Sequence, residues 1–210
     1  DVIRDADIAM YRAKSLGKAR FEIFDPDMRS SVLRRMELEN ELRHALEREE
    51  MRLLYQPIYS LKAERLLGFE ALLRWRNPLR GLVKPLDFIP LAEETGLILP
   101  IGDWVLRQAC AHLRQWQQDF PQAAPLVTSV NISSRQMASP GFPEQVRGAL
   151  EAAGVAGESL RFEITEGLCI DSDGVVEQAF KELSSLGIRF AIDDFGTGYS
   201  ALSYLHAYPI

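Results

Sequence analysis

Cysteine and histidine are scarce in this sequence, which has two cysteines and three histidines among 210 residues. Cys110 and Cys169 lie far apart in apolar surroundings, and their spacing matches no zinc-binding pattern. We therefore expect free, buried thiols in a reducing compartment and no disulfide. The histidines have no partner nearby in the sequence and are interpreted as structural or surface residues: His44, His112 and His206.

Long hydrophobic runs and an excess of positive charge are also missing. No apolar stretch reaches the roughly 18 residues that predict a membrane span, and no signal peptide opens the chain. A formal net charge of -6 argues against binding to a DNA or RNA duplex, which requires a basic face. A small phosphodiester could still bind if divalent cations neutralised the carboxylates. We expect a cytoplasmic segment without membrane contact, whether or not the parent protein is anchored upstream.

The apolar fraction of 47% is enough for a sizeable core and suggests one or two domains. The first residues read as mid-domain sequence. Residues 4–16 predict a helix that Gly17 ends, and residues 20–24 predict a short strand that Pro26 ends. One helix and one strand cannot bury a core alone, so residues 1–24 are interpreted as the tail of a larger domain.

Residues 25–50 predict a linker between that tail and a second domain. The segment 28–50 is highly charged and suits a helix with an i,i+4 ladder of opposite charges on one face. Its apolar stripe is expected to dock on the second domain, with a dimer-forming coiled coil as the alternative. The stripe comprises Leu38, Leu42, Ala45 and Leu46, and the ladder comprises Arg35, Glu39, Arg43 and Glu47.

In residues 51–210, strand-like runs alternate with helical patterns, which is typical of a parallel sheet with crossover helices. A short pattern, Arg161-Phe162-x-Ile164, recurs at residues 189–192, about one βα unit further along. The fold class predicted is α/β, a TIM-like (β/α) barrel in preference to an open sheet. The strands are predicted at 52–59, 66–75, 126–133, 160–166 and 188–195, and the helices near 87–95, 102–119, 143–153 and 175–186.

The stretch IRFAIDDFGTGYS at residues 188–200 carries the strongest local signal for chemistry. A buried strand ends there on two adjacent carboxylates, Asp193 and Asp194, followed by Gly196 and Gly198. Two anions side by side at the end of a buried strand require a cation or hydrogen-bond donors to offset their repulsion. An ordinary strand-to-loop turn is the alternative, so the interpretation depends on whether other strand ends bring oxygen ligands to the same place.

Strand alternation predicts that they do. If the apolar residues of each strand lie under helices, one oxygen-bearing side chain from each of four strands points to the opposite, inner face: Glu70, Asn131, Glu163 and Asp193. Ligands that are all oxygen favour Mg²⁺ or Mn²⁺. Asp194 could bridge to a second ion, and two ions would suit in-line hydrolysis of a phosphodiester.

Several motifs in order make the sequence resemble the EAL family of cyclic di-GMP phosphodiesterases. The resemblance covers residues 38–210, and residues 1–24 resemble the C-terminal end of a GGDEF (diguanylate cyclase) domain without its catalytic loop. The matching motifs are Gln56-Pro57-Ile58, Glu70-Ala71-Leu72-Leu73-Arg74-Trp75, Asn131-Ile132-Ser133, Glu163-Ile164-Thr165-Glu166 and the stretch from Asp193 to Ser200.

The resemblance implies a role for each matching residue. Glu70, Asn131, Glu163 and Asp193 would hold one metal ion, and Asp193 or Asp194 would engage a second, which makes Glu70 and both aspartates the catalytic set. The complete site would hold two Mg²⁺ or Mn²⁺ ions.

The substrate, cyclic di-GMP, would be contacted by Gln56 and Arg74, with Asp87 as a weaker candidate for a base contact. Glu166 would brace the loop that begins at Phe195, and that loop couples substrate binding to a homodimer in the family. Without the motifs around them, Arg74 would be interpreted as a surface ion pair and Glu166 as a solvated strand end.

One departure from the family concerns the end of the chain at Ile210. A closed barrel of this type needs eight strands, and the family has further strands that bear a lysine, an aspartate and a glutamate. We therefore expect a truncated barrel, from a parent protein that hydrolyses cyclic di-GMP to linear pGpG, and an inactive 210-residue chain.

Two other functions compete with this hypothesis. A non-catalytic receptor for cyclic di-GMP could pass its signal through the helix at 28–50, although a pure receptor would not need the metal ligands. An enolase-like carboxylate–Mg²⁺ enzyme would need a lysine or histidine base at a strand end, and none of the predicted strand ends offers one.

Overall fold

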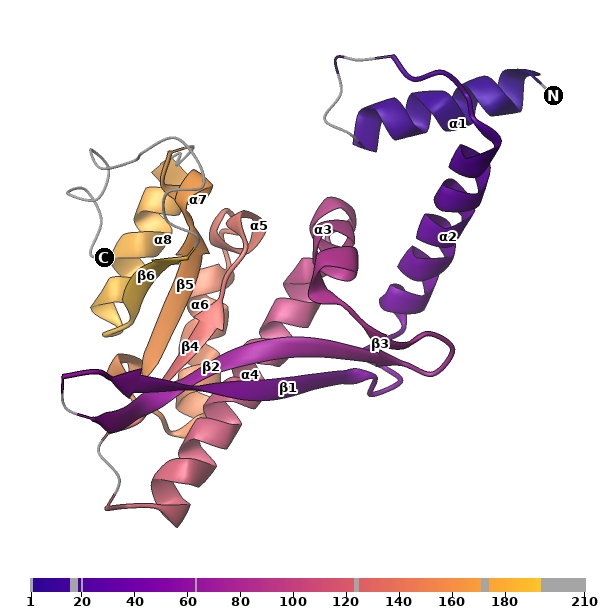
Figure 1. Ribbon diagram of the computed structural model, residues 1–210. Helices are drawn as coiled ribbons and strands as arrows, with labels where there is room; N and C mark the ends of the chain where they lie inside the picture. Colours follow the sequence, from indigo (N-terminus) through magenta and orange to yellow (C-terminus); the bar gives the residue numbers. More distant parts are fainter. Residues whose placement is uncertain are drawn as a thin grey trace. The chain divides into compact units, whose positions relative to one another are not determined.

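The computed structural model describes residues 2–15, 19, 21–62, 64–122, 125–170 and 174–193 (Figure 1). They belong to two compact units, Asp1–Arg48 and Glu49–Ile210. No helix in these ranges is both long and apolar enough to cross a membrane.

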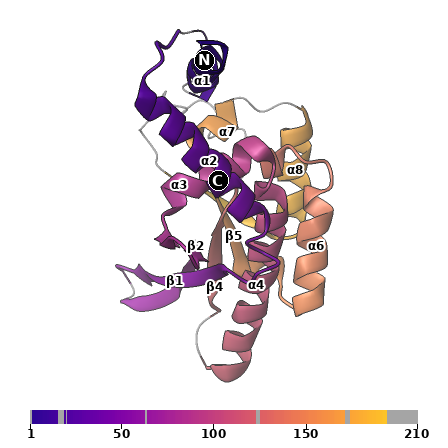
Figure 2. The ribbon, with the colours of Figure 1, turned by 90° about the vertical axis from the view of Figure 1, so that its right-hand side faces the viewer.

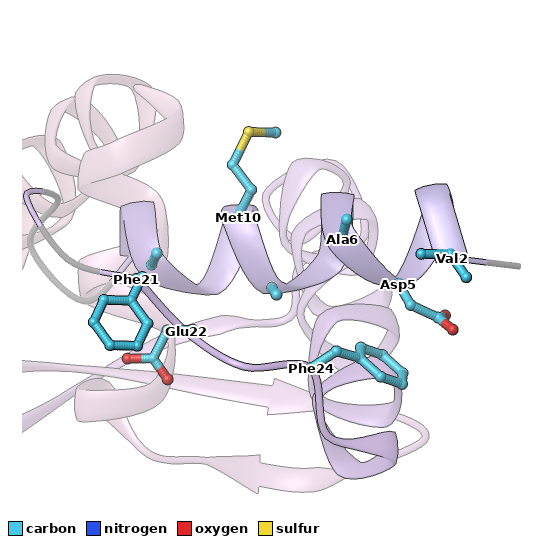
Figure 3. Close-up of a pocket in the computed structure, with 9 residues that line it drawn as sticks. Val2, Asp5, Ala6, Met10, Phe21, Glu22 and Phe24 are labelled. Carbon is cyan, nitrogen blue, oxygen red and sulfur yellow. The ribbon is translucent and has the colours of Figure 1, made fainter.

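The first unit consists of α1 (Val2–Ser15) and α2 (Pro26–Arg43). The helix α2 begins at a proline, and the Asp25 side chain caps it by accepting a hydrogen bond from the Asp27 N–H at 3.1 Å. An ion pair of 2.6 Å between Arg29 and Asp5 joins the two helices. A groove of about 650 Å³ lies beside α1 and is lined on its other side by Phe21, Glu22 and Phe24 (Figure 3).

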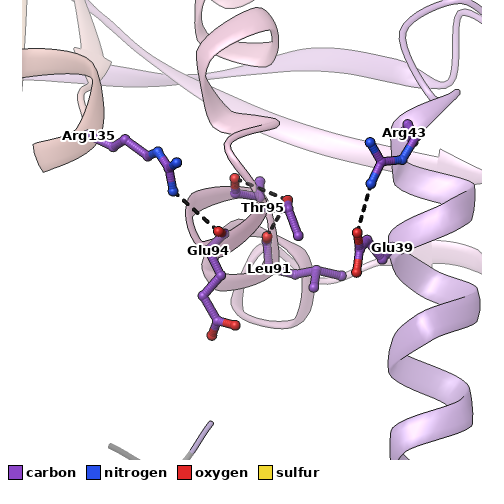
Figure 4. A network of polar contacts seen from close by, with 7 residues as sticks. Glu39, Arg43, Leu91, Glu94, Thr95 and Arg135 are labelled. Carbon is purple, nitrogen blue, oxygen red and sulfur yellow. Dashed lines mark hydrogen bonds and ion pairs between the residues drawn. The ribbon is translucent and has the colours of Figure 1, made fainter. Parts of the chain in front are cut away.

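Two predictions for this unit were wrong. Residues 21–24 do not form a strand, because no neighbouring strand of the described first unit is there to pair with them. The linker helix ends at Arg43 instead of continuing to residue 50. Residues 44–49 form turns, and Glu49 has a left-handed φ of 54° that no helix continues through. One rung of the predicted charge ladder is confirmed, between Arg43 and Glu39 at 2.8 Å (Figure 4).

The second unit is built on a six-stranded sheet with the order β1-β2-β4-β5-β6, and β3 pairs with β2. β1 (Met51–Ser60) and β2 (Arg65–Asn77) form an antiparallel hairpin, whereas β4, β5 and β6 run parallel to β2. The predicted parallel sheet is therefore wrong for β1, since the connection between residues 60 and 65 is too short for a crossover. The remaining strands are β3 (Gly81–Val83), β4 (Val127–Asn131), β5 (Leu160–Thr165) and β6 (Arg189–Asp193).

Helices follow the strands in the order that the sequence predicts. The long ones are α3 (Pro85–Thr95), α4 (Ile98–Asp119), α6 (Phe142–Ala153) and α8 (Gly174–Ser185). Four short elements were not predicted: the strand β3, α5 (Ser134–Met137), the 3₁₀ helix η1 (Gly157–Ser159) and α7 (Glu166–Ile170). Parallel strands joined by helices on one outer face are consistent with a TIM-like fold.

The core lies between the sheet and α4, α6 and α8, which stand side by side against one of its faces (Figures 1 and 2). Aromatic pairs join each helix to a strand: Trp116 to Tyr55 with ring centroids 4.7 Å apart, Phe142 to Phe162 at 6.0 Å, and Phe180 to Phe190 at 4.7 Å. Burial of apolar surface at these contacts stabilises the unit. On α4, which contains the predicted range 102–119, one face is buried: Val105, Leu106, Ala109 and Leu113, with Trp116 half-buried beside them.

Candidate active site

The face of the sheet opposite the helices carries the predicted site residues. Side chains of residues paired across neighbouring strands point to the same face. The register pairs Glu70 with Gln56 on one side and with Ser129 on the other, and it pairs Asn131 with Glu163. Asp193 pairs with Thr165, two residues beyond Glu163 and therefore on the same face. The strands thus carry these residues on one face of the sheet, as the alternation predicted.

Two of the four predicted ligands are in direct contact. The Asn131 side-chain amide donates a hydrogen bond from Nδ2 to Glu70 Oε1, with a length of 2.8 Å. The two residues come from β4 and β2, which are adjacent parallel strands. The contact fixes the carboxylate of Glu70 beside the amide of Asn131, so both side chains offer oxygen atoms from the same place on the sheet.

The negative charges of Glu70 and Asp193 change the pKa of Glu163. Burial raises the pKa of this half-buried carboxyl group, and Glu70 and Asp193 raise it further, whereas Ser129 and Arg161 oppose the shift. Neighbouring negative charges disfavour ionisation of a carboxylate. Glu70 and Asp193 are therefore each close enough to Glu163 to disfavour its negative charge, and a bound cation would relieve that repulsion.

A metal site is consistent with the chemistry of these donors but is not closed in the structure. Three carboxylates and one amide are the oxygen ligands that Mg²⁺ and Mn²⁺ prefer. Among the residues that the structure describes, however, no group of three His, Cys, Asp or Glu side chains is arranged to hold a metal ion. The structure brings the predicted ligands to one face without gathering them around one point.

The residues expected to contact a substrate lie on the same face. Gln56 is exposed and pairs with Glu70. Arg74 is half-buried, lies four residues after Glu70 on β2, and donates to the carbonyl oxygen of Leu73 at 2.9 Å. Asp87 is exposed in the first turn of α3.

Glu166 differs from what its sequence position suggests. It begins α7 and only 5% of it is exposed, so the interpretation as a solvated strand end is wrong. The chain turns into a helix directly after Thr165, which carries Glu166 into a buried place. The loop from Phe195 that it was expected to brace lies outside the described residues, as does Asp194.

One buried polar residue near the site was not singled out from the sequence. Gln136 follows Asn131 by one short turn and is 4% exposed. Its signal was the pattern Ser133-x-x-Gln136, which is typical of a capping box at a helix N-terminus.

A sequence model of the EAL domain matches residues 39–210. The chain belongs to the EAL domain family. The resemblance stated from the motifs is confirmed at this level, and its predicted start at residue 38 lies one residue from the start of the match.

Curated relatives align with the EAL chain over nearly its whole length. Cyclic di-GMP phosphodiesterase PdeR of Escherichia coli is 38% identical over 209 residues, which is 100% of this chain and 31% of PdeR. The bifunctional diguanylate cyclase/cyclic di-GMP phosphodiesterase MucR of Pseudomonas aeruginosa is 39% identical over 209 residues, 100% of this chain and 30% of MucR. The chain thus spans about a third or less of these relatives, and 24% of protein y4lL of Sinorhizobium fredii, which is 41% identical.

Solved structures of EAL proteins share the fold. The PaMucR phosphodiesterase in complex with c-di-GMP gives a TM-score of 0.77 at 40% identity, over 82% of this chain and 69% of that one. The FimX EAL domain of Pseudomonas aeruginosa bound to c-di-GMP gives 0.73 at 30% identity, over 82% and 68%. Both structures contain cyclic di-GMP, so the nucleotide is a ligand of proteins with this fold.

Proposed function

We propose that this chain is the phosphodiesterase part of a signalling protein and that it hydrolyses cyclic di-GMP to linear pGpG. The observation that carries the proposal is the row of oxygen donors on one face of the sheet, in which the Asn131 amide contacts Glu70 and the charges of Glu70 and Asp193 act on Glu163. The relatives add support, because PdeR and MucR are named as cyclic di-GMP phosphodiesterases.

Glu70, Asn131, Glu163 and Asp193 would hold a divalent cation, Mg²⁺ or Mn²⁺, and Asp193 or Asp194 would engage a second one. When bound, such ions lower the pKa of a coordinated water and stabilise negative charge on the phosphodiester oxygens. Within the chain, Asn131 fixes the orientation of the Glu70 carboxylate. Glu163 is half-buried, and a carboxylate that is partly removed from water attracts a cation more strongly.

Substrate contacts would come from Gln56 and Arg74 on the same face. The guanidinium of Arg74 is suited to a phosphate group, and the amide of Gln56 to a phosphate or a base edge. Glu166 would brace the loop that begins at Phe195, and two copies of the EAL domain would pair as a homodimer.

Residues 1–24 would be the tail of a GGDEF domain, residues 25–50 the linker and residues 51–210 the EAL domain of a cytoplasmic region. The alignment with MucR, named as a bifunctional cyclase and phosphodiesterase, covers all of this chain and so includes residues that precede the EAL match. Apolar side chains of the first unit are also exposed, among them Ile3 at 80%, Phe21 at 86% and Ile23 at 78%. Exposed apolar side chains of this kind suit a fragment of a larger core.

A second candidate function is a receptor that binds cyclic di-GMP without hydrolysing it. It draws on the FimX EAL domain of Pseudomonas aeruginosa, whose structure contains bound c-di-GMP. Titration calorimetry with cyclic di-GMP in EDTA and in Mg²⁺ separates the two. A receptor binds equally in both conditions and forms no pGpG.

The hydrolase is tested on the gene product that carries this chain, by chromatography of pGpG formed with Mg²⁺, with Mn²⁺ and with EDTA. We expect turnover that EDTA stops, and about a thousandfold loss in Glu163→Gln, since a metal site supplies several kcal/mol of transition-state stabilisation. Glu151→Gln, an exposed residue of α6, is the matched control and should retain full activity. Turnover that survives both EDTA and Glu163→Gln would overturn the proposal.

A further inference from the structure

The short helix α5 follows the strand that carries Asn131, and side-chain hydrogen bonds hold it at its N-cap and to the end of α3. Ser133 caps it: the Ser133 hydroxyl accepts the Gln136 N–H at 3.3 Å, and the Ser133 N–H donates to Gln136 Oε1 at 3.1 Å. The Ser133 hydroxyl also donates to Gln136 Oε1 at 2.9 Å. This capping box fixes the direction in which the chain leaves β4.

The buried amide of Gln136 fits against α4 at Gly102. A Cβ atom on residue 102 would overlap the Nε2 and Cδ atoms of Gln136, so a larger residue there would require the Gln136 side chain to shift. Gly102 is itself buried within α4. The Gln136 side chain therefore links α5 to a long core helix as well as to its own N-cap.

A second contact holds α5 from another side. The Arg135 guanidinium donates to the carbonyl oxygens of Glu93 and Glu94 at the C-terminal end of α3, the latter at 3.3 Å (Figure 4). Cations stabilise this end of a helix because its last carbonyl groups lack partners. Gly96, which ends α3 in the left-handed region with φ 82°, lies against the same guanidinium.

These contacts lie one turn from the candidate ligand Asn131. Between them, the Ile132 N–H donates to the carbonyl oxygen of Glu163 at 2.8 Å and joins the ends of β4 and β5. The Asn131 side chain is exposed, yet its amide reaches Glu70. Because an exposed side chain is little confined by packing, the direction of the Asn131 amide depends on the backbone on either side of residue 131.

We propose that Gln136 is a positioning residue for Asn131. Gln136 hydrogen-bonds to the N-cap residue Ser133 and also packs against Gly102 of α4. These two contacts fix the direction of the chain after β4, and that direction orients the Asn131 amide toward Glu70. The inference rests on the proposed function in so far as Asn131 and Glu70 serve as metal ligands. Groups that orient ligands from outside the coordination sphere commonly change metal affinity by about 10- to 100-fold.

The test uses Gln136→Met, which removes the acceptor at nearly constant volume, and Gln136→Glu, which keeps an acceptor for the Ser133 N–H. Gln145→Met makes the same change at an exposed position of α6 and is the matched control. Mn²⁺ affinity is measured by electron paramagnetic resonance, and the side-chain amide signal of Asn131 by NMR without metal. Q136M should weaken Mn²⁺ binding about 10-fold and shift the Asn131 amide signal, whereas Q136E restores both and Q145M changes neither.

A double-mutant cycle separates positioning from a general loss of structure. In an Asn131→Ala background, Q136M should cause no further loss of Mn²⁺ affinity, because the side chain that it positions is gone. An equal loss in both backgrounds would overturn the inference, as would an unchanged Asn131 amide signal in Q136M. A wild-type protein that binds no Mn²⁺ would instead overturn the proposed metal site, and the NMR signal would still decide the role of Gln136.

Gly102→Ala provides an independent variant in case Q136M fails to fold. It displaces the Gln136 amide while alanine favours the helix α4 more than glycine does. G102A should therefore weaken Mn²⁺ binding in the same way as Q136M with circular dichroism unchanged. Wild-type affinity in folded G102A would contradict the inference.

Discussion

The two faces of the sheet differ in composition, in burial and in what they are for. On the face under α4, α6 and α8, register partners form a continuous apolar row of Ala71, Val130, Phe162 and Phe190, and all four residues are buried. On the other face, Asn131 and Asp193 are exposed and Glu163 is half-buried. Neighbours along one strand, such as Phe162 and Glu163, therefore belong to different environments.

Because successive side chains of a strand point to opposite faces, the residues that stabilise the fold and the residues of the candidate site lie on different faces of the sheet. A shift of one residue in register would exchange the two sets of side chains and lose both. Substitutions on the helix face should change the free energy of unfolding and leave the chemistry of the folded protein intact. Substitutions on the polar face should mainly change the chemistry and change the free energy of unfolding less.

The largest effect on stability is expected at Phe162. Its side chain is fully buried between Phe142 and Phe190, so Phe162→Ala should lower the free energy of unfolding by about 3–5 kcal/mol. Urea denaturation followed by circular dichroism measures it. Thr165→Ala, at an exposed position of the same strand, is the control and should stay within about 0.5 kcal/mol. If both variants lost a similar free energy of unfolding, the helix face would not contribute more to stability than the polar face.

A smaller effect is expected at the hydroxyl group of Tyr55. Burial raises the pKa of Tyr55, with a further contribution from Cys110, so its phenol stays protonated and can donate to His112 Nδ1 at 2.7 Å. Tyr55→Phe removes this one hydrogen bond and keeps the packing on Trp116, which should cost about 1 kcal/mol. Metal affinity should not change. Thermal denaturation and Mn²⁺ titration on one sample check both expectations, and weakened metal binding would show that the faces are coupled.

Sequence reasoning recovered the fold where a pattern spans many residues. The alternation of Leu160, Phe162 and Ile164 with Arg161 and Glu163 identified the faces of β5, and the structure buries the apolar three. The same reasoning failed where pairing depends on a partner outside the local pattern. It read residues 20–24 as a strand although the described first unit offers no neighbour, and it missed the antiparallel direction of β1, which the length of a turn decides.

The candidate site was predictable as a set of residues but not as a geometry. Alternation placed Glu70, Asn131, Glu163 and Asp193 on one face, and the contact between Asn131 and Glu70 agrees with it. The contact of the Gln136 side chain with Gly102 could not be predicted, because it depends on the packing of α5 against α4. The burial of Glu166 was missed because Thr165 suits a strand as well as a helix N-cap, so the strand pattern could be continued through Glu166 although the helix α7 begins there.

The smallest expected effect comes from the polar face of the sheet. It is the contribution of Glu163 to the pH dependence of the free energy of unfolding, in the absence of metal. Because the pKa of Glu163 is raised in the folded protein by burial and by Glu70 and Asp193, the folded state holds this proton more tightly than the unfolded state does. Stability from this group is therefore present below the unfolded pKa of glutamate, about 4.3, and is lost as the pH rises through the folded pKa.

Glu163→Gln removes this titration, so in EDTA the variant should be more stable than the wild type at pH 7 and should lose that advantage below about pH 4. Urea denaturation at a series of pH values measures the difference, and Glu151→Gln should show none. Added Mg²⁺ should stabilise the wild type more than the variant, because a cation offsets the charge that burial disfavours. A wild type that gains stability over Glu163→Gln as the pH rises in EDTA would show that the carboxylate is already compensated by the protein. Cation binding would then have no repulsion to relieve on this face.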